Sequence, residues 1–228
     1  MTTQVSSGSL RDRIGRLLRD NRLAIGTEIL IVPLFFALQV PARSILFVLI
    51  GWLSLWLRRS GWRHIGMNRP VSWRRTVLLG VGIGVVYNVL DIAIIVPLLH
   101  RLTGESLDLS QFDSLRNNFT VLLFMLAVVW IKAGFGEEMA YRGYILNRLA
   151  DFFGRGKAGW TLGLMISAFF FGFAHGYQGI TGMADTLLFG VLAGVLYLTS
   201  GRNLWLPVIA HGVMDTMTFT LIFLGLYP

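Results

Sequence analysis

The sequence has no cysteine and little charge: among its 228 residues there is no Cys, and Asp, Glu, Lys and Arg together make up 14%. Without cysteine the chain has no disulfide framework, no thiolate nucleophile and no cysteine-bound zinc or iron–sulfur site. Soluble domains carry roughly 25% charged residues, so the low charge argues against a soluble globular protein. The 16 Phe and 7 Trp argue against disorder, because disordered chains have few aromatic residues.

Long apolar stretches dominate what is present. Hydrophobic residues make up 54% of the chain, and the mean hydropathy is +0.64. A helix that crosses the hydrocarbon of a bilayer needs about 20 mostly apolar residues. Seven stretches meet or approach this length: Leu23–Val40, Ser44–Leu57, Thr76–Leu99, Phe119–Gly136, Ala158–His175, Met183–Thr199 and Leu204–Leu224. The sequence therefore predicts an all-α, polytopic transmembrane helical bundle with about seven spans.

The basic residues lie between these stretches, mostly on one side. Sixteen of the 20 Lys and Arg fall in the N-terminal segment and in alternate loops, three fall in the opposite loops, and Lys132 lies within a span. By the positive-inside rule this distribution places the N-terminus in the cytoplasm. We expect a basic cytoplasmic segment, 1–22, followed by a single transmembrane domain, 23–228. The net charge of +8 then indicates a lipid bilayer as partner and no nucleic acid.

Ionisable residues inside apolar stretches mark candidate functional sites, because burying them in lipid is costly. The adjacent pair Glu137 and Glu138 ends the fourth stretch, and adjacent helical residues point about 100° apart. Glu138 precedes Arg142 by four residues, the favourable order for an ion pair, so we interpret both as structural. Glu137 is then free to act, with Tyr141 next on its face.

The spacing of the remaining candidates predicts that they meet. Gly154-Arg155-Gly156 breaks the helical pattern and predicts a cytoplasmic hairpin tip. Glu137 lies 19 residues before Gly156 and His175 lies 19 after it, at the same height in an antiparallel hairpin. His211 and Asp215 are four residues apart and share a face of the last span. We expect the three helices to bring these side chains together in the cytoplasmic half of the bundle.

One carboxylate beside two imidazoles suits the activation of water by a general base. Phe171, one turn before His175, supplies an apolar wall, while His211 and Asp215 orient a carbonyl group or stabilise an oxyanion. The alternative is a polar network that only holds three helices together. This structural interpretation is favoured for four further charged residues in or near the spans that show no converging partner: Glu28, Asp91, Lys132 and Asp185.

The three elements together resemble the CAAX-protease and bacteriocin-processing family of intramembrane proteases, also called the Abi family. Its pattern is EExxxR, then FxxxH, then HxxxN or HxxxD, on successive membrane helices. The matching residues here are Glu137-Glu138-xxx-Arg142, Phe171-xxx-His175 and His211-xxx-Asp215. The resemblance covers about 121–224, which we expect to be the catalytic core.

The resemblance implies an intramembrane endopeptidase whose cavity opens to the cytoplasm. In the similar type II CAAX prenyl endopeptidases the first Glu has the role assigned here to Glu137, and His175, His211 and Asp215 would position water and stabilise the oxyanion. Asp215 stands where that branch has Asn, and a carboxylate is a poorer oxyanion donor unless protonated. Bacteria generally lack prenylated CAAX proteins, and this Arg-rich chain has a bacterial character. We therefore expect a peptide or membrane-protein substrate in a bacterial inner membrane.

Two other functions compete with this one. Glu137, His175, His211 and Asp215 are also acceptable zinc ligands, although the HExxH helix motif is absent and no cofactor is favoured. The family that the sequence resembles also includes proteins linked to bacteriocin immunity. By that resemblance the chain would be a non-catalytic binding protein. A transporter is less favoured, because the sequence has no internal repeat.

Overall fold

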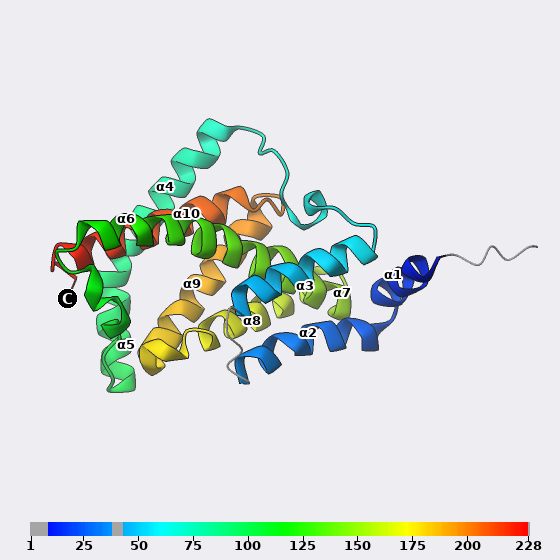
Figure 1. Ribbon diagram of the computed structural model, residues 1–228, viewed down its shortest axis with the longest axis horizontal. Helices are drawn as coiled ribbons and strands as arrows, with labels where there is room; N and C mark the ends of the chain where they lie inside the picture. Colours follow the sequence, from blue (N-terminus) through cyan, green and yellow to red (C-terminus); the bar gives the residue numbers. More distant parts are fainter. Residues whose placement is uncertain (1–8, 38–42, 228) are drawn as a thin grey trace, which may run out of the picture.

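The structure is a computed structural model that describes residues 9–37 and 43–227, and all regular elements in these ranges are helical (Figure 1). The α-helices are α1 (Leu10–Asp20), α2 (Arg22–Ala37), α3 (Arg43–Leu57), α4 (Trp73–Leu90), α5 (Val96–Thr103), α6 (Phe119–Val128), α7 (Leu146–Phe153), α8 (Lys157–Phe173), α9 (Gly179–Thr199) and α10 (Trp205–Phe223). Three short 3₁₀ helices, η1 (Trp62–Ile65), η3 (Ser110–Leu115) and η6 (Gly176–Gln178), lie in the connections. The all-α prediction is confirmed for this part of the chain.

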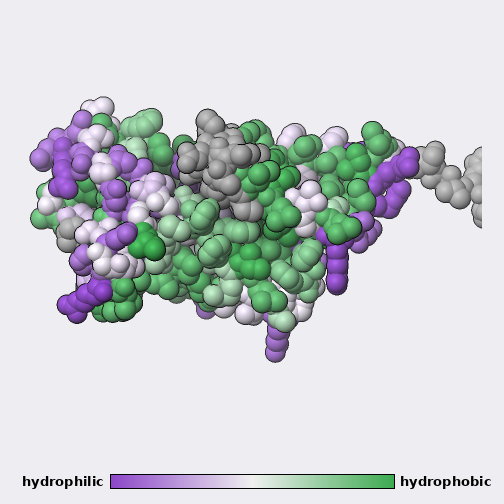
Figure 2. All heavy atoms as spheres, turned by 90° about the horizontal axis from the view of Figure 1, so that it is seen from below, coloured by the Kyte–Doolittle hydropathy of each residue, from purple (hydrophilic) through white to green (hydrophobic). Residues whose placement is uncertain are grey.

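Four helical stretches are long and apolar enough to cross a membrane: Trp73–Thr103, Phe119–Phe153, Gly176–Thr199 and Trp205–Phe223. The second and fifth expected spans correspond to shorter apolar helices, Leu46–Leu57 and Lys157–Phe173. The first corresponds to α2, and its last residues, 38–40, lie outside the described ranges. Figure 2 shows apolar side chains over the middle of one face and hydrophilic ones towards both ends. These features indicate an integral membrane protein, while the number of crossings and their orientation stay predictions.

Small residues let the helices approach closely. α4 lies along α10, and α8 packs between α7 and α9. A Cβ atom on Gly84 of α4 would lie 2.6 Å from the carbonyl oxygen of Ala210, and one on Gly172 would lie 2.6 Å from that of Met183. Only glycine permits this approach, as expected for helices that pack through small residues in lipid. These contacts fix the spacing of α4, α8, α9 and α10 around the centre of the bundle.

Two of the membrane helices are irregular where they carry carboxylates. Between α6 and α7 the backbone is π-helical over η4 (Val129–Glu137) and η5 (Met139–Ile145). Between α4 and α5 it is π-helical over η2 (Asp91–Ile95). A π-helix accommodates extra residues by bonding i to i+5, and such segments occur frequently at functional sites. The hydropathy of the sequence does not reveal these π-helical segments.

The segment between α5 and α6 is only partly the solvated outer loop that its acids suggest. Its carboxylates are exposed, but the Asp108 N–H donates to the Gln178 carbonyl oxygen at 3.1 Å, so the segment folds against the start of α9. Its apolar residues point inward: Leu115 is fully buried, and Leu107 and Phe112 line an internal cavity. The charges alone would predict a solvated loop, but the leucines and the phenylalanine between them pack inward.

A buried ionic cluster joins α2, α3 and α7. The Arg148 guanidinium contacts Glu28 and also lies 2.9 Å from Asp151, which in turn faces Arg58 at 3.7 Å. The Tyr144 hydroxyl donates to Glu28 at 3.1 Å. Glu28 therefore has converging partners that the sequence did not reveal, although its structural interpretation fits the arrangement. We call these residues the N-terminal ionic cluster.

Candidate active site

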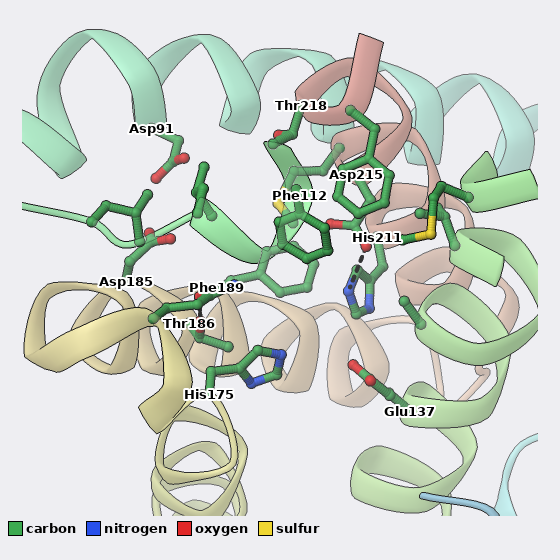
Figure 3. A pocket seen from close by; sticks show the side chains of 18 of the residues that line it. Asp91, Phe112, Glu137, His175, Asp185, Thr186, Phe189, His211, Asp215 and Thr218 are labelled. Atoms are coloured by element: carbon green, nitrogen blue, oxygen red, sulfur yellow. Dashed lines mark hydrogen bonds and ion pairs between the residues drawn. The ribbon is translucent and has the colours of Figure 1, made fainter. Parts of the chain in front are cut away.

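The four predicted site residues line one cavity of about 160 Å³ (Figure 3). Glu137 ends η4, His175 follows α8, and His211 and Asp215 lie on successive turns of α10. The helix break at Gly154, which has φ 91°, returns the chain antiparallel and sets Glu137 opposite His175. A cavity needs about 10–15 Å³ to hold one water molecule, so this one has room for several water molecules.

The ring of His175 is held by its own helix. Its Nδ1 lies 2.8 Å from the carbonyl oxygen of Phe171, so a hydrogen on Nδ1 donates to that oxygen. In the neutral ring, Nε2 is then an acceptor, and Figure 3 shows the ring directed into the cavity towards Glu137. His175 therefore offers the cavity a hydrogen-bond acceptor whose direction is set by the backbone.

The ring of His211 is held between two carboxylates. Its Nδ1 lies 2.8 Å from Glu138 Oε1, and its Nε2 lies 3.5 Å from Asp215 Oδ2. The same Glu138 oxygen accepts from Arg142 Nη1 at 2.9 Å, so the predicted ion pair between Glu138 and Arg142 is present. Glu138 thus has a second contact that helical spacing did not show: it orients a histidine from another helix. A carboxylate in this position sets the tautomer and the direction of the ring.

The buried Arg142 is satisfied on three sides. Besides Glu138 it donates to the Gly190 carbonyl oxygen at 3.1 Å, and its guanidinium lies 4.4 Å from the ring centre of Phe171. The Phe171 ring packs edge-on against those of His175, at 4.9 Å, and His211, at 6.0 Å. Phe171 lines the cavity as the apolar wall that its spacing predicts, and it also ties Arg142 to both histidines.

Glu137 is buried, with 8% of its surface exposed, but it is not without a partner. Its Oε1 lies 3.4 Å from Nζ of Lys132, which corrects the expectation that Lys132 has none. Tyr141, expected on the same face as Glu137, instead packs in the apolar core with its ring centre 4.9 Å from that of Phe171. The π-helical backbone explains the difference, because residues four apart are no longer aligned as in an α-helix.

A second pair of acids lines the same cavity. Asp91 begins η2, Asp185 lies on α9, and both side chains border the cavity. Figure 3 shows them facing one another, away from Glu137. Both were expected to lack converging partners; each is in fact the partner of the other. Since the residues are 94 positions apart in the sequence, no local pattern connects them.

The described ranges contain no preformed set of ligands for the zinc ion of the alternative mechanism. Within residues 9–37 and 43–227, no group of three or more His, Asp or Glu side chains is arranged to hold a metal ion. His175 and His211 together have four ring nitrogens, and three of these already face other protein groups: the Phe171 carbonyl, Glu138 and Asp215. A bound zinc ion would have to compete with these contacts.

Comparison with known proteins identifies the region that contains the site. Residues 119–217 match the family model described as type II CAAX prenyl endopeptidase Rce1-like. An Escherichia coli protein described as an uncharacterized 24.3 kDa protein is 33% identical over 105 residues, 45% of this chain and 45% of that protein. This chain therefore covers less than half of that relative's length. No solved structure matches this chain. The matched region holds all three motifs and the four cavity-lining residues, so residues 119–217 form a domain of the Rce1-like type II CAAX prenyl endopeptidase (Abi) family.

Proposed function

We propose that the protein is an intramembrane endopeptidase in which Glu137 activates a water molecule for attack on a peptide carbonyl. Family membership implies a peptidase, and one observation carries the mechanism: a buried carboxylate and Nε2 of two histidines reach one cavity, with Nδ1 of each ring already bound. Fixed rings of this kind need no reorganisation during the reaction, which is the condition for strong electrostatic stabilisation.

The groups divide the chemistry between them. The Glu137 carboxylate takes a proton from water as the oxygen attacks the carbonyl carbon, and Nε2 of His175 accepts the second water hydrogen and aligns the molecule. The carbonyl oxygen becomes an oxyanion, which a protonated His211 stabilises through Nε2–H. Glu137 then gives its proton to the leaving nitrogen as the C–N bond breaks, which yields a carboxylic acid and an amine.

Asp215 has the role of an acceptor in this scheme. At 3.5 Å from Nε2 of His211 it lies where a carboxylate favours the protonated ring. It therefore acts through His211 and not as a direct oxyanion donor, which accounts for an Asp where related prenyl endopeptidases have Asn. Glu138, which contacts Nδ1 on the other side of the His211 ring, favours the protonated ring in the same way.

The substrate class follows from the setting of the site. The cavity lies among helices of membrane-spanning length, so we infer a peptide or a membrane protein as substrate, reached from the cytoplasmic side of a bacterial inner membrane. The cysteine-free chain allows a direct test of this orientation. In intact cells, Arg69→Cys should resist a membrane-impermeant maleimide and Asp113→Cys should react; the reverse pattern would overturn the assignment.

The function is tested by comparing the wild type with Glu137→Gln after reconstitution with a pool of peptides and membrane proteins. New termini are identified by mass spectrometry. Asp113→Asn is the matched control, since it makes the same carboxylate-to-amide change on an exposed side chain. We expect the same new termini with the wild type and the control, and none with Glu137→Gln.

A parallel experiment with a metal chelator distinguishes activation of water by the glutamate alone from activation by a metal ion. Cleavage that persists with o-phenanthroline supports activation by the glutamate alone, whereas loss that added zinc restores would assign the same residues to a metal centre. If the wild type and Glu137→Gln give the same termini as an empty vesicle, the endopeptidase proposal fails. A binding role of the bacteriocin-immunity type then becomes the better explanation.

A further inference from the structure

The end of the cavity away from Glu137 holds a buried acid pair without a cation. Asp91 is 6% exposed, and its carboxyl group meets that of Asp185 across the space between η2 and α9 (Figure 3). Across residues 9–37 and 43–227, neither carboxyl has a lysine or arginine partner. Because two adjacent carboxylates repel each other when both are ionised, a buried acid pair of this kind is best balanced by one shared proton and a cationic partner.

Several oxygen atoms at this end of the cavity have no hydrogen-bond partner. In the described part of the chain these are Oδ1 of Asp91, Oδ1 of Asp185 and the hydroxyl of Tyr87, all buried. The three residues line the cavity together. A buried polar atom left without a partner destabilises the folded protein, and a charged one does so more strongly. A pair that served only to join two helices would not need to border a cavity with free acceptors.

These features define the chemistry of a complementary ligand. It must carry positive charge to balance the pair, donate several hydrogen bonds to close-set oxygens, and be small enough to enter between two helices. A primary ammonium group has one positive charge, three N–H donors and no acceptor. A planar guanidinium is larger and suits flat, two-pronged carboxylate contacts in place of three acceptors around one point.

We propose that Asp91 and Asp185, with the Tyr87 hydroxyl, form a binding subsite for a primary ammonium group. If the proposed endopeptidase function holds, this group belongs to the substrate, and it is either a lysine side chain or a free N-terminus. The ammonium occupies the acid pair while a peptide carbonyl lies before Glu137 at the other end of the same cavity. The subsite thereby sets which bond of the substrate reaches the glutamate.

The binding step is tested without any cleavage, on the full chain in detergent micelles. n-Butylamine, which is an ammonium ion at neutral pH, is compared with the neutral N-butylacetamide by ligand-observed NMR. We expect the wild type to bind the amine at least about tenfold more tightly than the amide, because burial strengthens the attraction of opposite charges. Asp91→Asn/Asp185→Asn should bind the two probes alike, whereas Glu137→Gln should keep the preference for the amine.

Two results would overturn the subsite: equal binding of amine and amide by the wild type, or an unchanged amine preference in Asp91→Asn/Asp185→Asn. The first needs no variant, so the test stands even if the double substitution prevents folding. Tyr87→Phe, which removes one acceptor but no charge, should weaken amine binding by only a few-fold. A larger loss in Tyr87→Phe than in the double variant would contradict the assignment to the acid pair.

A cleavage arm distinguishes the two sources of the ammonium group. The peptide pool is offered with its lysine side chains acetylated, or with its N-termini acetylated. Loss of cleavage only after lysine acetylation assigns the subsite to a lysine, and loss only after N-terminal acetylation assigns it to the chain terminus. Glu137-dependent cleavage that neither modification changes would overturn the substrate role. Amine selectivity with no Glu137-dependent cleavage would refute the endopeptidase function and leave the ammonium site standing.

Discussion

The N-terminal ionic cluster and the central cavity both bury charge, but they balance it differently. In the cluster, Glu28 and Asp151 face Arg148 and Arg58, so each acid has a cation. Around the cavity acids are in excess, and the Asp91–Asp185 pair has no cation in the described chain. A paired buried charge is hydrogen-bonded and inert, whereas an unpaired one keeps acceptors for something else. The comparison separates residues that hold helices together from residues available for chemistry.

The largest expected effect is on activity and comes from the cavity. Glu137→Gln removes the general base, and such a base contributes about 10²–10⁴-fold to the rate. We expect cleavage to fall by that factor while the thermal unfolding midpoint changes little, because glutamine has the size of glutamate and is neutral in the buried site. Initial rates and unfolding curves on the same preparation provide the measurement. A variant retaining more than a tenth of the wild-type rate would remove Glu137 from the mechanism.

The opposite outcome is expected in the N-terminal ionic cluster. Arg148→Met leaves the buried Glu28 without its cation, whereas Asp151 keeps Arg155 and Arg58, and breaking a buried pair costs about 3–5 kcal/mol. The free energy of unfolding should fall by this amount, while the rate per folded molecule stays near that of the wild type. Lys157→Met, on a residue exposed at the start of α8, is the neutral control. A large loss of specific activity would show that the cluster and the cavity are coupled.

Glu138 belongs to both kinds of region, since it is paired with Arg142 and also orients His211. Glu138→Gln keeps an oxygen for His211 but loses the charge, and outer contacts of this type are worth about 10–100-fold in activity. We predict a loss within that range together with reduced stability. The matched variant Glu28→Gln should lower stability only. Equal effects of the two substitutions on the rate would mean that Glu138 is structural alone.

A smaller effect is expected at Asp215. Asp215→Asn keeps an oxygen that can accept from His211 Nε2, so we expect less than about a tenfold change in rate. Asp215→Leu removes the acceptor and should cost more. Comparison of kcat for the two variants tests the acceptor role: equal losses would contradict it.

The smallest effect is expected at Lys132, whose side chain is 57% exposed. Exposed ion pairs contribute about 0–1 kcal/mol, so Lys132→Met should change the rate by only a few-fold. Rates measured at low and high salt provide the check, since added salt should reduce the wild-type rate towards that of the variant. A loss comparable to that of Glu137→Gln would place Lys132 among the catalytic residues.

The sequence predicts those features that depend on spacing along one helix. The ion pair between Glu138 and Arg142, the shared face of His211 and Asp215, and the helix break at Gly154 all follow from local periodicity. Their arrival at one cavity follows from the antiparallel return of the chain. The pattern of helix ends and apolar runs therefore predicts most of the helical bundle, because each stretch must satisfy its own backbone groups in lipid.

Contacts between distant segments could not be predicted in this way. Glu28 with Arg148, Asp91 with Asp185, and Glu138 with His211 join residues whose separation carries no periodic signal. Each depends on which helices become neighbours, and the close approaches at glycines such as Gly84 and Gly172 are one part of that packing. The π-helical turns add a further difference, since they change which side chains share a face.

The π-helical segment η4 has a consequence for how the active-site helix tolerates change in length. A π turn holds one more residue than an α turn, so η4 stores slack between the apolar α6 and the motif that begins at Glu137. Deleting a residue there would tighten the segment to α geometry and keep α6 aligned with Glu137, whereas the same deletion in a regular α-helix would turn the two by about 100°.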